Sequence, residues 1–176
     1  MNSFPAKVSI IHRRWFLAGT ALIILMAGAC QSRVQSGPSI KSGGLGLSRT
    51  EWERLHGHTT NQDSGYSYYK DEPGQFIINF MGRGAAYIKR SYDDPAGVTL
   101  EEARKESQKL IPQDSRLIRT YNASAGPVDL YFSDALKPIF PTDDYWIHGE
   151  PGNFIVLYFS DHGIIDSFVI GLGNNP

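Results

Sequence analysis

Residues 72–78 read EPGQFII and residues 150–156 read EPGNFIV, so one pattern occurs twice, with five of its seven positions identical. Proline suits the first central position of a tight turn, and glycine tolerates the positive φ of the second. The apolar residues that follow are typical of a β-strand. We therefore predict that each copy is a turn that opens a strand, with Gly74 and Gly152 at equivalent positive-φ positions.

Further strands are predicted around these two stretches. Each copy runs through a short Gly-containing turn into a second strand-like stretch, which predicts two β-hairpins. The run FIVLYF is apolar on both faces, so we expect it in the interior of a sheet. A strand is expected near Leu117–Tyr121, and alternation predicts a half-buried strand at Val128–Phe132. The hairpin strands are Gln75–Met81 with Ala85–Tyr92, and Asn153–Phe159 with Ile164–Leu172.

Two helices are predicted from reciprocal capping patterns. Ser48 with Glu51, and Thr99 with Glu102, have the spacing of a capping box. The prediction is an α+β fold, an antiparallel sheet of two related hairpin or meander units with two helices packed on one face. The helical residues expected to be buried against the sheet are Trp52, Leu55, Leu100 and Leu110.

The amino-terminal residues are predicted to direct export. Met1–Arg14 contains Lys7, Arg13 and Arg14 and no acid, and Trp15–Ala29 is a mostly apolar run of 15 residues. A basic segment before a short apolar run is typical of a signal peptide. A spanning helix needs about 20 apolar residues, so this run is short for one.

The end of this run predicts a lipid anchor. The residues Ala27, Gly28, Ala29 and Cys30 resemble the bacterial lipobox, in which small residues precede a cysteine that is lipidated and becomes the first residue. Cys30 is the single cysteine of the chain. The alternatives are an ordinary signal peptide with a chance cysteine, or an uncleaved anchor. Lipidation would anchor the protein to a cell membrane or an outer membrane without spanning it.

The export route has two interpretations. Residues 12–18, HRRWFLA, resemble the twin-arginine motif, with Arg13 and Arg14 followed by apolar residues. His12 and Ala18 depart from that pattern, which usually has Ser or Thr and Lys there. The alternative is an ordinary Sec signal with two adjacent arginines. A twin-arginine signal would imply that the domain folds before export.

The chain is predicted to contain one folded domain. The 176 residues divide into a signal peptide at 1–29, the lipidated cysteine with a flexible Ser/Gly-rich tether at 30–47, and an α+β domain at 48–176. The repeat predicts an internal duplication, with units 48–92 and 99–172. The alternative is that Glu-Pro-Gly is simply a favourable turn sequence.

Parts of the domain resemble two families of exported proteins. Residues 46–57 and 159–165 are similar to the opening helix and closing hairpin of lipoprotein modules of the SmpA/OmlA and β-lactamase-inhibitor-like type. Residues 111–133, 150–154 and 171–174 resemble a family of uncharacterised bacterial exported proteins. The first resemblance implies a helix followed by an antiparallel meander. Neither resemblance implies a catalytic residue or a known activity.

The composition and motifs favour a protein without a cofactor. Lys and Arg number 17 against 18 Asp and Glu, which gives no electrostatic reason to expect a nucleic-acid partner. One cysteine excludes an internal disulfide framework and a Cys-based zinc cluster. The chain has no phosphate-binding loop and no recognised nucleophile motif. His56 and His58 could bind a metal as a pair, but histidines at a helix end equally well stabilise the helix dipole.

Two functions of different class are compatible with this sequence. The first is a non-enzymatic envelope lipoprotein, facing the periplasm or the exterior, that binds a protein or cell-wall partner through its sheet. The second is an envelope hydrolase that uses the carboxylates of Asp143, Asp144 and Glu150, which otherwise belong to a solvated loop. We favour the first. Its binding surface is expected among the tyrosines and one tryptophan, unless these stabilise the sheet by cross-strand pairing: Tyr66, Tyr68, Tyr69, Tyr87, Tyr92, Tyr121, Tyr131, Tyr145, Trp146 and Tyr158.

Overall fold

The computed structural model describes residues 40–93 and 97–174. Two α-helices, eight strands and two short 3₁₀ segments form this part of the chain. In chain order they are α1 (Arg49–His56), β1 (Asn61–Asp63), β2 (Tyr66–Asp71), β3 (Gly74–Met81), β4 (Gly84–Tyr92), α2 (Leu100–Leu110), β5 (Arg116–Ala123), β6 (Gly126–Phe132), η1 (Asp134–Leu136), η2 (Asp143–Tyr145), β7 (Asn153–Asp161) and β8 (Ile164–Leu172).

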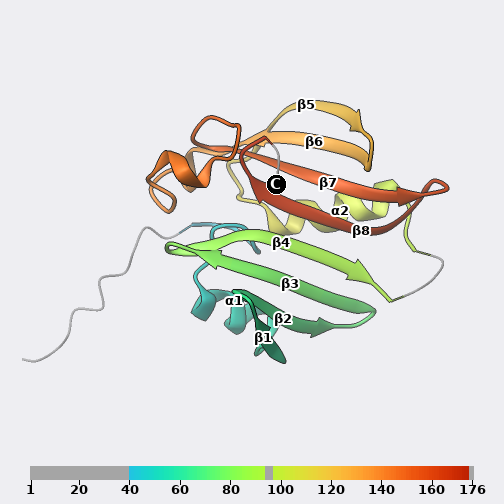
Figure 1. Ribbon diagram of the computed structural model, residues 1–176, viewed down its shortest axis with the longest axis horizontal. Helices are drawn as coiled ribbons and strands as arrows, with labels where there is room; N and C mark the ends of the chain where they lie inside the picture. The colour runs from blue at the N-terminus through green and yellow to red at the C-terminus, as the bar shows by residue number, and fades with distance from the viewer. Residues whose placement is uncertain (1–39, 94–96, 175–176) are drawn as a thin grey trace, which may run out of the picture. The chain divides into compact units, whose positions relative to one another are not determined.

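All eight strands belong to one antiparallel sheet with the order β1-β2-β3-β4-β8-β7-β6-β5. The order divides into two four-stranded meanders, β1–β4 and β5–β8, which meet where β4 pairs with β8. Figure 1 shows the first meander in the lower half of the view and the second in the upper half. Each meander follows a helix in the sequence, α1 before β1 and α2 before β5.

The predicted hairpins, the interior position of the FIVLYF strand and the two helix starts are confirmed. β3 pairs with β4 and β7 with β8 as antiparallel hairpins, and β7 lies inside the sheet between β6 and β8. Both helices begin with a complete capping box, Ser48 with Glu51 and Thr99 with Glu102. In each box the cap hydroxyl accepts from the backbone N–H three residues on, and the glutamate accepts from the cap residue's own N–H.

The predicted α+β fold, in which two helices packed on one face make the layer that covers the sheet, is wrong. The described residues form a β-rich fold, an eight-stranded antiparallel sheet with α-helices of only 8 and 11 residues. Such short helices have few positions that can face a sheet. Trp52 and Leu110 are buried, but Leu100 is half-buried, and Leu55 is 48% exposed and lines a groove with Gly43 and Lys109.

Residues 40–47, which the composition assigns to the tether, pack into the domain, and we call this segment the strap. Ile40, Leu45 and Leu47 are buried. The strap runs along the end of α2, where the Leu45 amide donates to the Leu110 carbonyl at 2.7 Å, and the Gly46 amide then donates to the Ala85 carbonyl on β4 at 2.9 Å. The strap therefore packs next to the sheet, where only helices were predicted. The predicted end of the tether at residue 47 is wrong, because residues 40–47 belong to the folded domain.

The two Glu-Pro-Gly turns differ in backbone conformation. Gly152 has φ of +100°, as predicted, whereas Gly74 is already the first residue of β3 and does not have a positive φ. A Cβ at Gly74 would overlap the backbone carbonyl of Ser91 on β4. Position 74 therefore requires glycine because β3 and β4 lie too close there to leave room for a Cβ. The prediction that the two turns are equivalent is wrong.

Candidate functional site

The two faces of the sheet have different surroundings. One face, which we call the inner face, packs against the strap, the helices and the segment 133–152 in a single buried cluster. Figure 1 shows α2 passing behind β7 and β8, so the inner face points away from the reader. Strand residues of this face include Phe76, Ile78, Ile88, Phe154, Val156, Tyr158, Phe168 and Ile170, and the residues packed on them include Leu45, Trp52, Ala103, Leu136 and Phe140.

The opposite or outer face carries an apolar row across the sheet. Directly opposed residues of antiparallel strands have their side chains on the same face. The strand register gives one continuous row from β2 to β5: Tyr68, Ile77, Lys89, Val169, Leu157, Val128 and Tyr121. The neighbouring row contains Tyr66, Asn79, Tyr87, Gly171, Ile155, Leu130 and Arg119.

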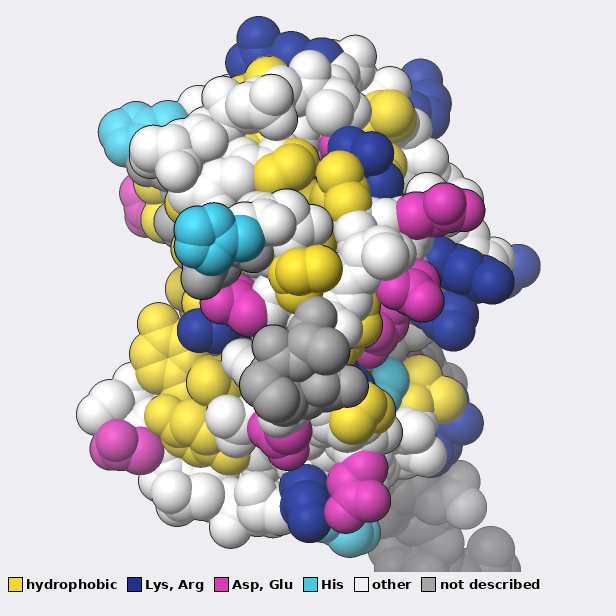
Figure 2. Space-filling model, turned by 90° about the vertical axis from the view of Figure 1, so that its right-hand side faces the viewer, with side chains coloured by type: hydrophobic (Ala, Val, Ile, Leu, Met, Phe, Trp, Pro, Cys, Tyr) yellow, Lys and Arg dark blue, Asp and Glu magenta, His cyan; other side chains and the backbone are white. Residues whose placement is uncertain are grey.

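The outer face has its own small apolar centre. Val128, Leu130 and Ile155 are buried and form a cluster with Tyr121 and Leu157 that is separate from the main core. Figure 2 shows this face edge-on at the left of the view, where further hydrophobic side chains gather in the lower half, on the side of the first meander. The outer face therefore carries apolar side chains from both meanders.

Two cations lie on this face, each against an aromatic ring. The Lys89 ammonium is 6.0 Å from the centre of the Phe159 ring, and the Arg119 guanidinium is 5.1 Å from the centre of the Tyr121 ring. In the part of the chain that the structure describes, neither cation has a carboxylate within ion-pair distance. Each is thus held by a weak cation–π contact and keeps its charge available to a partner.

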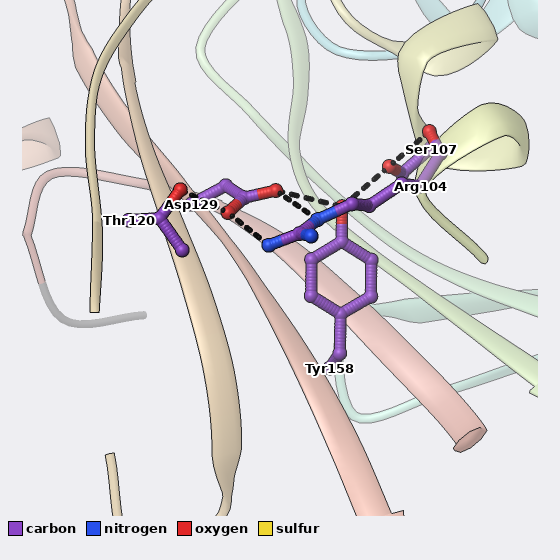
Figure 3. A network of polar contacts seen from close by, with 5 residues as sticks. All are labelled: Arg104, Ser107, Thr120, Asp129 and Tyr158. Carbon is purple, nitrogen blue, oxygen red and sulfur yellow. Dashed lines mark hydrogen bonds and ion pairs between the residues drawn. The ribbon is translucent and has the colours of Figure 1, made fainter. Parts of the chain in front are cut away.

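The inner face contains a buried ionic network, drawn in Figure 3. Asp129 on β6 is 3% exposed and accepts two hydrogen bonds of 2.9 Å from the Arg104 guanidinium on α2. The Thr120 hydroxyl donates to the same carboxylate at 2.8 Å. The Tyr158 phenol donates to it over a longer distance of 3.4 Å, and Ser107 Oγ lies 2.8 Å from the phenol oxygen.

This network stabilises the fold. Burial raises the pKa of Tyr158, and the negative charge of Asp129 acts in the same direction, so the phenol stays protonated. The bidentate hydrogen bonds to Asp129 raise the pKa of the Arg104 guanidinium. Because the carboxylate oxygens are occupied by partners from α2, β5 and β7, we assign the network a role in positioning α2 on the sheet.

A second ionic contact holds α2 to the other meander. Arg90 on β4 is buried and donates to the Glu106 carboxylate at 2.9 Å and to the Asp71 carbonyl at 2.9 Å. Its guanidinium lies 4.6 Å from the centre of the Phe76 ring. The Tyr92 phenol donates to Glu106 at 2.8 Å, and burial raises its pKa. Helix α2 is thus fixed to both meanders by charge-assisted hydrogen bonds.

The carboxylates expected for a hydrolase are only partly brought together. Asp143 and Glu150 line one shallow depression next to His148, and Asp144 does not line it. All three carboxylates are on exposed residues. The structure thus brings two of the three predicted carboxylates to one depression and leaves the third outside its lining.

The two predicted histidines have separate roles. His56 stacks on Trp52 with ring centres 4.2 Å apart, and its Nε2 lies 2.7 Å from the Gly43 carbonyl oxygen, so it fastens the strap to α1. The exposed His58 lies 3.4 Å from a Glu53 carboxylate oxygen. Within residues 40–93 and 97–174 there is no group of three His, Cys, Asp or Glu side chains that could hold a metal ion.

The predicted export residues lie outside the described residues: Arg13, Arg14, Ala27, Gly28, Ala29 and Cys30. The predicted aromatic residues divide between the faces of the sheet. Tyr66, Tyr68, Tyr87 and Tyr121 are on the outer face, whereas Tyr69, Tyr92, Tyr131 and Tyr158 are on the inner face. No helix of the described segments has the length and apolarity needed to cross a membrane.

The site residues that the sequence missed are charged residues inside strands. A half-buried strand was predicted at Val128–Phe132, but both faces of β6 are buried, and Asp129 lies on the inner face, where Arg104 compensates its charge. Lys89 and Arg119 have no motif around them. A single charge within an otherwise apolar strand is a signal that could have identified Asp129.

Comparison with known proteins gives little that bears on function. No family model matches the chain, and no curated protein matches it. A solved structure of a cysteine-rich secretory protein from Staphylococcus aureus is similar with a TM-score of 0.38 and 13% sequence identity. The match covers 77% of this chain and 48% of that protein, so the chain spans about half of its length.

Proposed function

We propose that this protein is a non-enzymatic lipoprotein of the bacterial cell envelope that binds another protein through the outer face of its sheet. The observation that carries the proposal is the combination, on that face, of half-buried apolar side chains such as Tyr121 and Leu157 with two cations that lack carboxylate partners among the described residues. Apolar centres surrounded by polar groups are typical of protein interfaces. The partner that fits is a protein surface with apolar side chains at its centre and Asp or Glu at its edge.

The anchoring part of the proposal rests on the sequence. Cys30 follows the small residues of a lipobox-like segment, directly after the apolar run of an export signal. Acyl chains on Cys30 would keep the domain at an inner or outer membrane, facing the periplasm or the exterior. Arg13 and Arg14 are the residues that would select the twin-arginine route over the Sec route.

Site-specific crosslinking in the producing cells tests the binding face. A photo-reactive amino acid is placed at Tyr68 or Tyr121 on the outer face, or at the exposed Lys105 on α2 as a matched control. We expect a protein adduct from both outer-face positions and none from position 105. The adduct should be lost when Lys89→Glu and Arg119→Glu are combined, because like charges facing each other across an interface weaken binding by about tenfold or more.

Three results would contradict the proposal. Adducts that form at position 105 and not at the outer face would place the interface elsewhere. Adducts that persist unchanged in the charge-reversal variant would show that Lys89 and Arg119 do not contribute to binding. An adduct that disappears on digestion of the cell-wall glycan would identify a glycan in place of a protein.

A further inference from the structure

The strand register brings several chain segments together at one end of the sheet, which we call the strap end. It contains the β3–β4 turn, the start of β5, the end of β6, the start of β7 and the end of β8. The strap enters the domain at this end. The Lys41 carbonyl accepts from the Gln113 amide at 2.8 Å, three residues before β5, and the Leu47 carbonyl accepts from the Ala85 amide at 2.8 Å near the start of β4.

Several large apolar side chains are exposed at the strap end. Leu117 and Ile118 are 55% and 52% exposed, Ile147 is 48% exposed and Met81 is 41% exposed. Leu117 and Ile118 are adjacent at a bulge of the edge strand β5, where Leu117 pairs with Tyr131 and Arg119 with Leu130, so that Ile118 has no partner residue. A bulge disrupts pairing and redirects side chains at a sheet edge, and here two large apolar side chains are left in contact with solvent.

The length of chain between the predicted anchor and the strap limits the distance of this end from the membrane. Ile40 lies ten positions after Cys30. Even fully extended, ten residues reach at most about 36 Å. If Cys30 carries acyl chains, the strap end is therefore the part of the domain that is held nearest to the bilayer.

We propose that the strap end contacts the lipid bilayer directly, with Leu117 and Ile118 inserted at the interface between headgroups and acyl chains. This inference rests on the lipid anchor of the proposed function. Leucine and isoleucine gain free energy on leaving water for the bilayer interface, and the anchor supplies the high local concentration that two side chains alone would not provide. The contact would also fix the orientation of the domain, with the sheet strands directed away from the membrane.

The charges at the strap end predict the lipid dependence of this contact. Basic and acidic side chains are interspersed there, with Arg116 and Lys137 beside Asp134 and the Asp114 carboxylate accepting from the nearby Ser133 hydroxyl. Arg116 and Lys137 already pair with Asp134. The attraction is therefore apolar, and we expect similar contact with neutral phosphatidylcholine vesicles and with vesicles that contain anionic phosphatidylglycerol.

Spin labels on the full-length lipoprotein test the inference in vesicles of both compositions. One label is attached at an introduced cysteine, Ile118→Cys, and the control label at Ile164→Cys, which is 41% exposed and lies at the opposite end of β8. We expect the label at 118 to collide more with oxygen than with a water-soluble nickel chelate, and the label at 164 to show the reverse. Leu117→Ser in the 118-labelled protein should reduce the oxygen preference.

Mass spectrometry of the same sample separates this inference from the proposed function. If Cys30 is acylated and the label at 118 is as accessible to the nickel chelate as the label at 164, the bilayer contact is wrong and the anchor is right. If Cys30 carries no acyl chain, both the anchor and this inference are overturned. An oxygen preference at 118 that appears only with anionic lipid would overturn the apolar mechanism.

Discussion

Arg104 on α2 and Asp129 on β6 face each other with two hydrogen bonds of 2.9 Å, Nε to Oδ2 and Nη2 to Oδ1. The carboxylate is 3% exposed and the arginine side chain is 35% exposed. The pair crosses β7, whose Tyr158 lies within reach of both, with its ring centre 5.8 Å from the guanidinium. Helix α2 is therefore located on the second meander by a directional contact in addition to apolar packing.

Removing one member of this pair should be costly. Arg104→Met leaves the buried Asp129 carboxylate with only the hydroxyls of Thr120 and Tyr158, so we expect a loss of about 2–3 kcal/mol in the free energy of unfolding. Urea denaturation measures it. The control is Arg116→Met, because Arg116 is 70% exposed and pairs with Asp134 at 3.5 Å, a surface contact that should contribute less than about 1 kcal/mol. Equal losses in the two variants would show that the buried pair contributes no more to stability than the surface pair.

Local chemistry explains which parts of the fold could be predicted. The capping boxes of Ser48 and Thr99 and the hairpin turns depend on neighbours within a few residues, so the sequence carries them directly. The strap could not be recognised. Its glycines are typical of a flexible linker, yet a Cβ at Gly43 would overlap the Lys109 carbonyl. Glycine that permits close packing and glycine that permits flexibility look the same in a sequence.

The buried tyrosines predict a loss of stability in alkali. Burial raises the pKa of five tyrosines above the value of about 10 that holds in the unfolded chain: Tyr69, Tyr87, Tyr92, Tyr131 and Tyr158. Above pH 10 the unfolded chain therefore loses protons first, and the stability that is fully present below pH 10 falls as the pH rises. Denaturant unfolding between pH 8 and pH 11 measures the fall.

The Tyr158→Phe variant measures how much of the loss of stability above pH 10 comes from Tyr158. The variant should be less stable at pH 8, by about 1 kcal/mol, because the phenol contacts with Ser107 and Asp129 are lost. Its further loss between pH 10 and pH 11 should be smaller than that of the unchanged protein, because one titrating group has been removed. If the free energy of unfolding falls equally in the two proteins between pH 10 and pH 11, Tyr158 does not contribute to the alkaline loss of stability.

The capping box of α2 predicts that part of the stability of the protein is lost at acidic pH. The backbone N–H of Thr99, and then its hydroxyl, donate to the Glu102 carboxylate and lower its pKa. The stabilisation from this group is therefore present above the pKa of a glutamate in the unfolded chain and is lost as the pH falls through the lower folded value. Glu102→Ala should be less stable than the unchanged protein at pH 7, and the difference should vanish in acid. A double-mutant cycle with Thr99→Ala should show strong non-additivity.

The candidate site was harder to predict than the fold because its residues come from distant segments. Lys89 and Arg119 share a face only because the register of the intervening strand pairs aligns them in neighbouring rows. Asp129 is inward because a helical arginine 25 positions earlier reaches it. Alternation indicates which residues share a face, but it does not indicate which face a helix covers or where a buried charge finds its partner.

Alanine substitutions at three glycines distinguish the cost of a strained backbone from the cost of a steric overlap. Gly163 has φ of +84°, and a Cβ there would meet no described residue beyond its chain neighbours within 4 Å, so Gly163→Ala should cost about 1 kcal/mol from the left-handed conformation alone. Gly152 has φ of +100°, and a Cβ there would also lie 2.9 Å from the Ser133 carbonyl oxygen, so Gly152→Ala should cost about 1–3 kcal/mol more. Gly74→Ala should be as severe as Gly152→Ala without any positive φ, because its Cβ would overlap the carbonyl of Ser91 and push β3 from β4. Urea denaturation of the three variants gives the order, and a Gly74→Ala protein as stable as Gly163→Ala would show that β3 and β4 can separate at little cost.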